Sequence, residues 1–521
     1  MKKAFEEIIL RNTGIPASQF IKDVRDPYIY NLSEAVDLLK KNISKTIHII
    51  GDYDSDGINA TAIMYHGLNY YGFKTTVRLP LRFSEGYGLS EKIIDEIDDG
   101  IILTVDNGIA AIDAVKKAKQ KGLTVIVTDH HQAAVKDGKV VMPEADIIVD
   151  PAVEDKSEFH DYCGAAIAYR FIKELLPKKL NLAGLMVLAS IATVTDVMPL
   201  TGANRTLVKD GLEAINHGRG VAGLRALLER LEKTSKLTEE DYGFLIGPIF
   251  NASGRLYDDG ASKMLDLLLS KKENPILPYM ADKLINTNNY RKEVLKNSME
   301  VAVEKLDGEK PIVVYDPSFG EGIIGLIAGR FCEDFHCPVV VFTKAHNGLL
   351  KGSGRSIKEI HLKKILDSIQ DKIVGYGGHA GAAGLSIREE DLDAFTEAFK
   401  KACGKIPEPA DPRRYDVSIN SFEEILEFIE EQKKYAPYGE GNPQIRVKFD
   451  NYCVNEFRAI GDGTHLLLKG DYLDSIGFGM FQKYQEMGFP KHINLYGYLK
   501  ESWFRDKVSY KMELEFIEKR N

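Results

Sequence analysis

The sequence has few cysteines and no long hydrophobic run. Five cysteines among 521 residues are too few for a disulfide-stabilised scaffold and indicate a reducing compartment. The longest uncharged run covers residues 180–195. It is shorter than the roughly 20 apolar residues that span a bilayer. We interpret this run as a buried helix and expect no contact with a membrane.

The N-terminus lacks the pattern of a secretory signal. Glu6 and Glu7 stand where a signal peptide needs a continuous apolar core, so we expect a cytoplasmic protein. The net charge of -9 argues weakly against a nucleic-acid partner, whose binding surface should be basic. Net charge says little about local patches, however, and metal-binding carboxylates add to the negative count.

The composition is that of an ordinary globular protein, with 44% hydrophobic and 28% charged residues. Residues 47–150 alternate short apolar runs with helical patterns. Strands are predicted at 47–50, 75–80, 101–106, 123–129 and 147–150, and helices at 59–71 and 110–121. Such repeats imply a parallel sheet covered on both faces, in which ligands bind beyond the carboxyl ends of the strands.

The rest of the chain changes character twice. Residues 160–300 are mostly helical in pattern, and strands are predicted again at 311–316 and 337–343. The proline-rich stretch 405–414 predicts a linker, and the short alternating segments after it favour a small β domain of the barrel type.

Three carboxylates alternate in the turn after the first predicted strand: Asp52, Asp54 and Asp56. Crowded like charges favour a divalent metal as their partner. A calcium loop of the EF-hand type would need a preceding helix, and a Glu where Ile63 stands. A solvated acidic turn stays open as an alternative.

Other candidate ligands follow later strands and the buried helix. Asp106 ends one predicted strand, although Asp-Asn-Gly is equally a common turn. His130 and His131 follow another strand, and adjacent side chains point in different directions. One can therefore bind a metal while the other faces a substrate. Imidazole among carboxylates favours Mn²⁺, Zn²⁺ or Fe²⁺. Asp196 follows the buried helix as a cap or as a ligand.

The charges of these groups balance a pair of metal ions. Asp54, Asp56, Asp106 and Asp196 carry four negative charges, His130 is a neutral donor, and two divalent ions bring four positive charges. A two-metal centre orients water and stabilises the attacking and leaving oxygens in phosphate-ester cleavage. We expect Asp106 to bridge the ions, because its strand should be central in the sheet.

The order of these motifs resembles a known family. GDYDSDG, VDNGI, TDHH and TVTDVMPL resemble the four motifs of the DHH phosphoesterase superfamily, and GGHAGAAG resembles the motif of its DHHA1 domain. RFSEGYGLS, NASGRL, GSGRS and PYGEGNPQ extend the resemblance to the RecJ family of single-strand-specific exonucleases, from about residue 20 to 519.

The resemblance implies a role for each matching residue. It implies metal binding by Asp54, Asp56, Asp106, His130 and Asp196, with Asp52 assisting. His131 and His379 would lie at the reacting phosphate, Arg82, Ser353 and Arg355 would hold the 5′ end, and Arg255 would contact the backbone. Arginine forks and a hydroxyl suit a terminal phosphate. An internal salt bridge for Arg255 and a loop contact for His379 are the alternatives.

The resemblance also implies an α/β fold class with several domains. These are an N-terminal segment (1–45), a parallel-sheet DHH domain (46–200), a helical connector (201–305), an α/β DHHA1 domain (306–403), a linker (404–415) and an OB-like β-barrel (416–519). The implied activity is 5′ to 3′ hydrolysis of single-stranded DNA to mononucleotides with two Mn²⁺ or Mg²⁺ ions, in DNA repair and recombination.

Two other functions stay open on the sequence alone. One is a phosphodiesterase for short oligonucleotides or cyclic dinucleotides, for which the DHH and DHHA1 motifs would suffice. The other is a catalytically silent DNA-binding scaffold, which would be expected to lose metal ligands. For the exonuclease we expect a monomer, with a single-strand-binding protein or a helicase as candidate partners.

Overall fold

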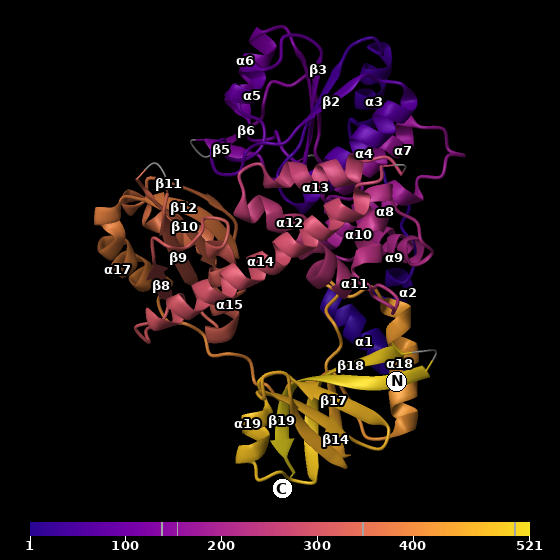
Figure 1. Ribbon diagram of the computed structural model, residues 1–521, viewed down its shortest axis with the longest axis vertical. Coiled ribbons are helices and arrows are strands. Elements are labelled where there is room, and N and C mark those ends of the chain that lie inside the picture. Colours follow the sequence, from indigo (N-terminus) through magenta and orange to yellow (C-terminus); the bar gives the residue numbers. More distant parts are fainter. Residues whose placement is uncertain (137–138, 154, 273, 346–347, 505–506, 521) are drawn as a thin grey trace. The chain divides into compact units, whose positions relative to one another are not determined.

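The computed structural model describes residues 1–136, 139–153, 155–272, 274–345, 348–504 and 507–520. Two compact units make up the chain (Figure 1). The first unit contains Met1–Arg78, Gly88–Gly247 and Ala410–Asn521, and the second contains Leu79–Tyr87 and Pro248–Pro409. Each unit is therefore assembled from segments that are distant in the sequence.

A five-stranded parallel sheet forms the centre of the first unit. Its order is β2 (Thr75–Arg78), β1 (Ile47–Ile50), β3 (Ile101–Val105), β4 (Thr124–Thr128) and β7 (Ile147–Val149). All five residues of β3 are buried, as expected for the middle strand of a covered sheet. The predictions of a parallel sheet and of a central strand before Asp106 are confirmed.

Helices cover both faces of this sheet. Ile93, Ile94 and Val115 of α5 (Glu91–Asp95) and α6 (Ile112–Gln120) pack on β3 and β4 from one side. On the other side lie α4 (Ser55–Tyr71) and α7 (Gly164–Leu175), which contact β3 and each other (Figure 1). The carboxyl edge of the sheet is left for the loops that carry the acidic motifs.

One local prediction in this region was wrong, and one element was not predicted. The helix expected from residue 59 begins at Ser55, because the Asp54 side chain accepts hydrogen bonds from the backbone of Asp56 and Gly57 and caps it. A short antiparallel hairpin, β5 (Ala134–Lys136) and β6 (Lys139–Val141), follows the two histidines and was not predicted. These two short strands lack the continuous apolar run by which β7 was recognised.

Further helices of the first unit lie before and after the parallel sheet in the chain. They are α2 (Ala17–Phe20), α3 (Leu32–Lys41), α8 (Ala183–Thr195), α9 (Gly202–Asn216), α10 (Ala222–Arg230) and α11 (Glu239–Asp241), with a π-helical turn at Tyr242–Ile246. Helix α8 is mostly buried, as its uncharged sequence predicts. No helix in the described part of the chain has the length and hydrophobicity to cross a membrane.

The C-terminal part of the first unit is a seven-stranded sheet. Its order is β13 (Val417–Ile419), β14 (Val447–Cys453), β18 (His492–Phe504), β19 (Lys507–Lys519), β17 (Leu473–Gly477), β16 (His465–Lys469) and β15 (Glu456–Ile460), with helices α18 (Phe422–Tyr435) and α19 (Phe481–Glu486). The N-terminal helix α1 (Lys2–Thr13) belongs to the same hydrophobic core through Phe5, Ile8 and Ile9. The ring centroids of Phe5 and Tyr435 lie 5.8 Å apart.

The second unit contains a mixed five-stranded sheet. Its order is β11 (Gly375–Gly378), β12 (Ala382–Ile387), β10 (Leu350–Arg355), β9 (Val339–Lys344) and β8 (Ile312–Tyr315). The strands expected at 311–316 and 337–343 correspond to β8 and β9. The helices are α12 (Gly247–Leu256), α13 (Gly260–Leu269), the 28-residue α14 (Leu277–Glu304), α15 (Ile324–Phe335), α16 (Leu362–Ser368) and α17 (Leu392–Cys403).

Candidate metal centre and substrate site

The acidic turn after β1 brings three carboxylates to the carboxyl edge of the parallel sheet. Oδ1 of Asp54 accepts hydrogen bonds from the backbone nitrogens of Asp56 at 2.9 Å and Gly57 at 3.1 Å. A β-carbon on Gly57 would lie 2.6 Å from the backbone of Asp52, so only glycine permits this close turn. The motif therefore needs its glycine to hold Asp52 beside the first turn of α4.

Asp56 is held by the N-terminus of a different helix. Its carboxylate is 1% exposed and accepts hydrogen bonds from the backbone nitrogens of Gly164 at 2.6 Å and Ala165 at 2.8 Å. Backbone N–H groups at a helix N-terminus have no partner within the helix, and they favour an anion. Helix α7 thus fixes a carboxylate that lies 108 residues earlier in the chain.

Asp106 lies at the centre of the cluster. It follows β3 with a backbone φ of 63°, and its backbone nitrogen donates to Thr128 O at 3.0 Å. A β-carbon on Gly164 would lie 2.5 Å from Cβ of Asp106, so α7 packs directly against this side chain. The next residue, Asn107, is buried and joins β1 to β3 through its side-chain nitrogen, which donates to Ile50 O and Val105 O.

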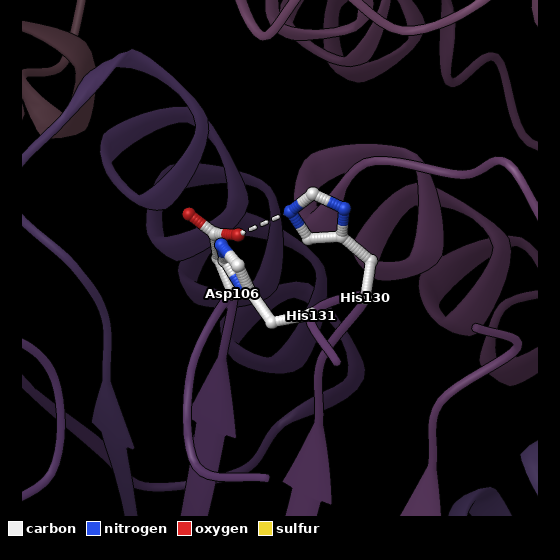
Figure 2. A group of neighbouring side chains, drawn as sticks. All are labelled: Asp106, His130 and His131. Atoms are coloured by element: carbon white, nitrogen blue, oxygen red, sulfur yellow. Dashed lines mark ion pairs between the residues drawn. The ribbon is translucent and has the colours of Figure 1, made fainter. Parts of the chain in front are cut away.

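His130 points its Nε2 atom at three carboxylates. The distances from this nitrogen are 3.1 Å to Asp106, 3.6 Å to Asp56 and 3.6 Å to Asp196 (Figure 2 shows the first). Asp196 caps the C-terminus of α8, and the neighbouring Thr195 donates its hydroxyl to Ser55 at 2.9 Å. The ends of α8 and α4 are thereby joined beside the cluster.

The electrostatics of the cluster fit a divalent cation. Burial lowers the pKa of His130, so its imidazole is neutral, and its Nε2, which faces carboxylate oxygens, is available as a metal ligand. Burial and the neighbouring carboxylates, Asp56 first, raise the pKa of Asp106 and Asp196 well above the ordinary value. Converging lone pairs repel one another unless a positive charge lies between them. Nitrogen and carboxylate oxygen together suit Mn²⁺ and tolerate Mg²⁺.

The ligand atoms form three overlapping groups, each with its atoms within 4.8 Å of one another. The groups are Asp52, Asp54 and Asp106; Asp56, His130 and Asp196; and Asp106, His130 and His131. Asp106 belongs to two of them, which is the position that a bridging carboxylate needs. The structure therefore brings together all seven residues that the sequence proposed for this centre.

The imidazole ring of His131 is oriented by the carboxylate of Asp129, to which no role was assigned from the sequence. Its Nδ1 lies 2.8 Å from Oδ1 of Asp129, and Figure 2 shows the ring beside Asp106. Burial acts to lower the pKa of His131, but the hydrogen bond and charge of Asp129 outweigh it and raise the pKa to about 9. His131 therefore carries a proton at neutral pH and presents a positive charge.

Asp129 and the N-terminus of α7 are the functional features that sequence reasoning missed. Asp129 is 1% exposed, and it also accepts hydrogen bonds from the backbone nitrogens of His130 at 2.8 Å and Ile109 at 2.9 Å. The first letter of the Asp-His-His motif was the available signal. Gly164 is the glycine of an ordinary Cys-Gly-Ala-Ala stretch, which carries no such signal.

Ser353 and Arg355 lie in the second unit, at alternate positions of β10. Arg355 donates to Ser353 Oγ at 3.2 Å and to Gly354 O at 2.8 Å. Within the described ranges it forms no salt bridge, and burial lowers its pKa. A β-carbon on Gly325 would lie 3.0 Å from Ser353 Oγ and 3.2 Å from Nη2 of Arg355. Both side chains therefore lie beside the N-terminus of α15, which favours an anion.

The backbones of Arg255 and Arg82 lie in the second unit, that of Arg255 beside the segment before α15 and that of Arg82 beside Asp258. The backbone oxygen of Arg255, on α12, would be 2.0 Å from a β-carbon on Gly322, which precedes α15. Arg82 is tied to Asp258, because its backbone nitrogen donates to Asp258 O at 3.3 Å and the Asp258 carboxylate accepts from Phe83 and Ser84. Asp258 was not expected from the sequence. His379 is exposed in the turn between β11 and β12.

Comparisons with known proteins agree with this arrangement. Family models match residues 46–191 (DHH family, N-terminal domain), 301–405 (DHHA1 domain) and 415–515 (RecJ OB domain). The single-stranded-DNA-specific exonuclease RecJ of Haemophilus influenzae is 31% identical over 96% of this chain and 92% of its own length. The RecJ of Escherichia coli is 31% identical over 83% of this chain and 80% of its own.

A solved structure extends the agreement to the fold. The crystal structure of Thermus thermophilus RecJ in complex with Mn²⁺ superimposes with a TM-score of 0.83 at 26% identity, covering 99% of this chain and 76% of that one. A Mg²⁺ complex of the same protein gives a TM-score of 0.78 at 25% identity and covers 74% of that chain. The chain belongs to the RecJ family of single-stranded-DNA-specific exonucleases.

Proposed function

We propose that this chain is a metal-dependent exonuclease that hydrolyses the phosphodiester bonds of single-stranded DNA in DNA repair and recombination. The observation that carries the proposal is the convergence of His130 Nε2 on three carboxylates at the carboxyl edge of the parallel sheet. The family membership supplies the substrate class. A single-strand-specific exonuclease needs a metal centre, a phosphate-binding site and a surface that binds the strand.

The metal centre would hold two Mn²⁺ or Mg²⁺ ions through Asp54, Asp56, Asp106, His130 and Asp196, with Asp52 assisting. When bound, such ions lower the pKa of water and stabilise charge on the phosphate. Asp106 follows the central strand β3 and would be the ligand shared by the two ions. His131, protonated and oriented by Asp129, stabilises negative charge on the scissile phosphate or donates a proton to the leaving oxygen.

The second unit would recognise the 5′ end. Arg82, Ser353 and Arg355 supply donors for a terminal phosphate, and Arg255 supplies one for the following backbone phosphate. Arg355 supports this role most directly, because it is a partly buried cation beside a helix N-terminus. Recognition of a 5′ phosphate implies 5′ to 3′ polarity, and the family resemblance supports release of mononucleotides. His379 would lie at the reacting phosphate.

A phosphodiesterase for short oligonucleotides or cyclic dinucleotides is the less favoured function. The family models match residues 415–515 as a RecJ OB domain, and a small substrate needs no such module. The monomeric state, the cytoplasmic location and the partnership with a single-strand-binding protein or a helicase stay predictions from the sequence.

The test uses a 5′-phosphorylated single strand of about 30 nucleotides with Mn²⁺, because an OB module binds roughly 4–16 nucleotides. We expect mononucleotide release, slower hydrolysis of a dinucleotide and little attack on a blunt duplex. Asp106→Ala should abolish hydrolysis while binding of the strand is retained. Equal rates on the single strand and the duplex, or a preference for the dinucleotide, would contradict the proposal.

A further inference from the structure

The segment that follows Asp196 contains a residue in an unfavourable conformation. Met198 N donates to Thr193 O and Val197 N donates to Val194 O, both at 3.1 Å, which ends helix α8 in a two-bond turn. The residue at the position of Val197 in such turns is left-handed and is usually glycine. Val197 has a φ of 57° although its β-carbon is branched. Such a conformation persists only where the surrounding structure holds it.

A loop of the C-terminal part of the unit closes on this turn. The loop comprises residues 437–444, with the sequence PYGEGNPQ. The backbone nitrogen of Leu200 donates to Glu440 O at 2.7 Å. A β-carbon on Gly439 would lie 2.8 Å from Cδ1 of Leu200, and one on Gly441 would lie 3.0 Å from Cβ of Pro199. The loop therefore fixes the two residues that come directly after the turn.

The loop itself is held firmly. Asn442 is fully buried, and its side-chain nitrogen donates to Tyr435 O and Pro437 O, both at 2.9 Å. Gly439 and Asn442 exchange backbone hydrogen bonds at 2.9 and 3.2 Å. The backbone nitrogen of Tyr438 donates to Glu239 at 2.9 Å. A displacement of the loop would break several of these bonds. The loop can therefore keep Val197 in its left-handed conformation.

We propose that the loop of residues 437–444 is a positioning element that holds Asp196 in the metal centre, so that metal affinity depends on a part of the chain that contributes no ligand. The hydrogen bond to Leu200 comes from the backbone of Glu440, and no side chain of this loop is among the candidate ligands. The inference rests on the proposed function, in which Asp196 is a ligand. It assigns the C-terminal domain a role in the metal centre besides strand binding.

The experiment compares Mn²⁺ binding by the full chain and by two glycine variants, using the electron paramagnetic resonance signal of free Mn²⁺. Gly441 has a φ of 70° and faces Pro199, whereas Gly479 has a φ of 67° and open space around its α-carbon. Both G441A and G479A place alanine in a left-handed conformation. We expect G441A to weaken Mn²⁺ affinity by about 10- to 100-fold, the range for groups that orient metal ligands, and G479A to change it less than about twofold.

A second variant keeps the test decisive if G441A folds poorly. Glycine at position 197 adopts the left-handed conformation without strain, so V197G should not need the loop to hold the turn. We expect V197G alone to bind Mn²⁺ like the unmodified chain. The double variant V197G/G441A should recover most of the affinity that G441A loses, which a general loss of packing would not allow.

Several outcomes would overturn the inference. One is unchanged Mn²⁺ affinity in G441A together with weaker binding of a single strand in EDTA, which would make the loop a DNA contact. Another is a loss of affinity that V197G does not restore. If the unmodified chain binds no Mn²⁺ and cleaves no single strand, the proposed function itself fails. If it binds and cleaves and G441A does the same, only the positioning role fails.

Discussion

At the scale of single residues, Asp106 contributes to function and opposes stability. It is buried among Asp52, Asp54, Asp56 and Asp196, which raise its pKa together with burial. A carboxyl group that is buried away from water and close to other carboxylates destabilises the fold when no cation is bound. The same arrangement gives the metal its affinity.

The substitution Asp106→Asn should therefore have opposite effects on the two properties. We expect kcat to fall by about three orders of magnitude, because a charged ligand is lost. The melting temperature of the metal-free protein should rise, because the amide is neutral without the proton that the buried carboxyl must take up. The control is Asp98→Asn, whose side chain is 99% exposed, and neither quantity should change there. A lower metal-free melting temperature for Asp106→Asn would contradict the electrostatic argument.

The pair of Asp129 and His131 predicts a change in the pH profile. The raised pKa of His131, about 9, keeps the imidazole protonated through neutral pH. Asp129→Asn removes the charge that raises this pKa, so the proton is lost at lower pH. The alkaline limb of the kcat profile at saturating metal should move toward neutral pH. An unmoved limb would mean that His131 does not act as a cation in the reaction.

The metal-ligand residues could be predicted from the sequence, but the groups that hold these residues in place could not. The ligands were recognisable because carboxylates and imidazoles followed predicted strands at one edge. The supports are backbone groups of Gly164 and Ala165 and the carboxylate of Asp129. Backbone donors of a distant helix leave no residue type to recognise, so only the three-dimensional structure locates them.

At the scale of elements, helix α7 is the support on which the centre depends. Its first residue donates to Asp56 and leaves no room beside Asp106. Gly164→Ala would place a β-carbon 2.5 Å from Cβ of Asp106 and should displace the carboxylates. We expect weaker Mn²⁺ binding and a lower melting temperature.

A second glycine provides the matched control for that substitution. Gly329 lies within helix α15, and a β-carbon there would meet no atom within 4 Å. Gly329→Ala should stabilise the protein by about 0.5–1 kcal/mol through helix propensity and leave Mn²⁺ affinity unchanged. Thermal unfolding and Mn²⁺ titration of both variants make the comparison. Similar effects of the two substitutions would refute the steric argument.

Elements with a clear apolar run were predicted, including the short strands β1 and β7, and elements without one were not. The strands before Asp106 and after residue 123 and the buried helix before Asp196 follow from apolar runs, which the covered sheet requires. The start of α4 was misplaced because Ser55 and Asp56 were assigned to the metal turn, whereas they are also its first helical residues. Helix α5 and the β5–β6 hairpin are too short for periodicity to indicate them.

At the scale of the whole molecule, metal binding and proton binding should be linked. Asp54, Asp106 and Asp196 have raised pKa values in the folded, metal-free state, and His131 has one of about 9. The folded state then binds more protons than the unfolded state. The free energy of unfolding therefore falls as pH rises through these values.

We expect the metal-free protein to melt at a lower temperature at about pH 9 than at about pH 7, because His131 loses its proton in this window. Added Mg²⁺ should raise the melting temperature more at the higher pH, where the ligands are deprotonated. Thermal unfolding in EDTA and in Mg²⁺ at both values measures this. A metal-free stability that increases over the interval would contradict the raised pKa values.

The packing of helix α1 in the core of the C-terminal sheet has a consequence for biosynthesis. Phe5, Ile8 and Ile9 are translated long before the strands of the C-terminal sheet that bury them. The apolar face of this amphipathic helix therefore stays uncovered until the C-terminal sheet is made, and a chain that terminates before that sheet never covers it. Chaperones that bind nascent chains would encounter this apolar face early, and quality-control proteases would find it on products that lack the C-terminal sheet.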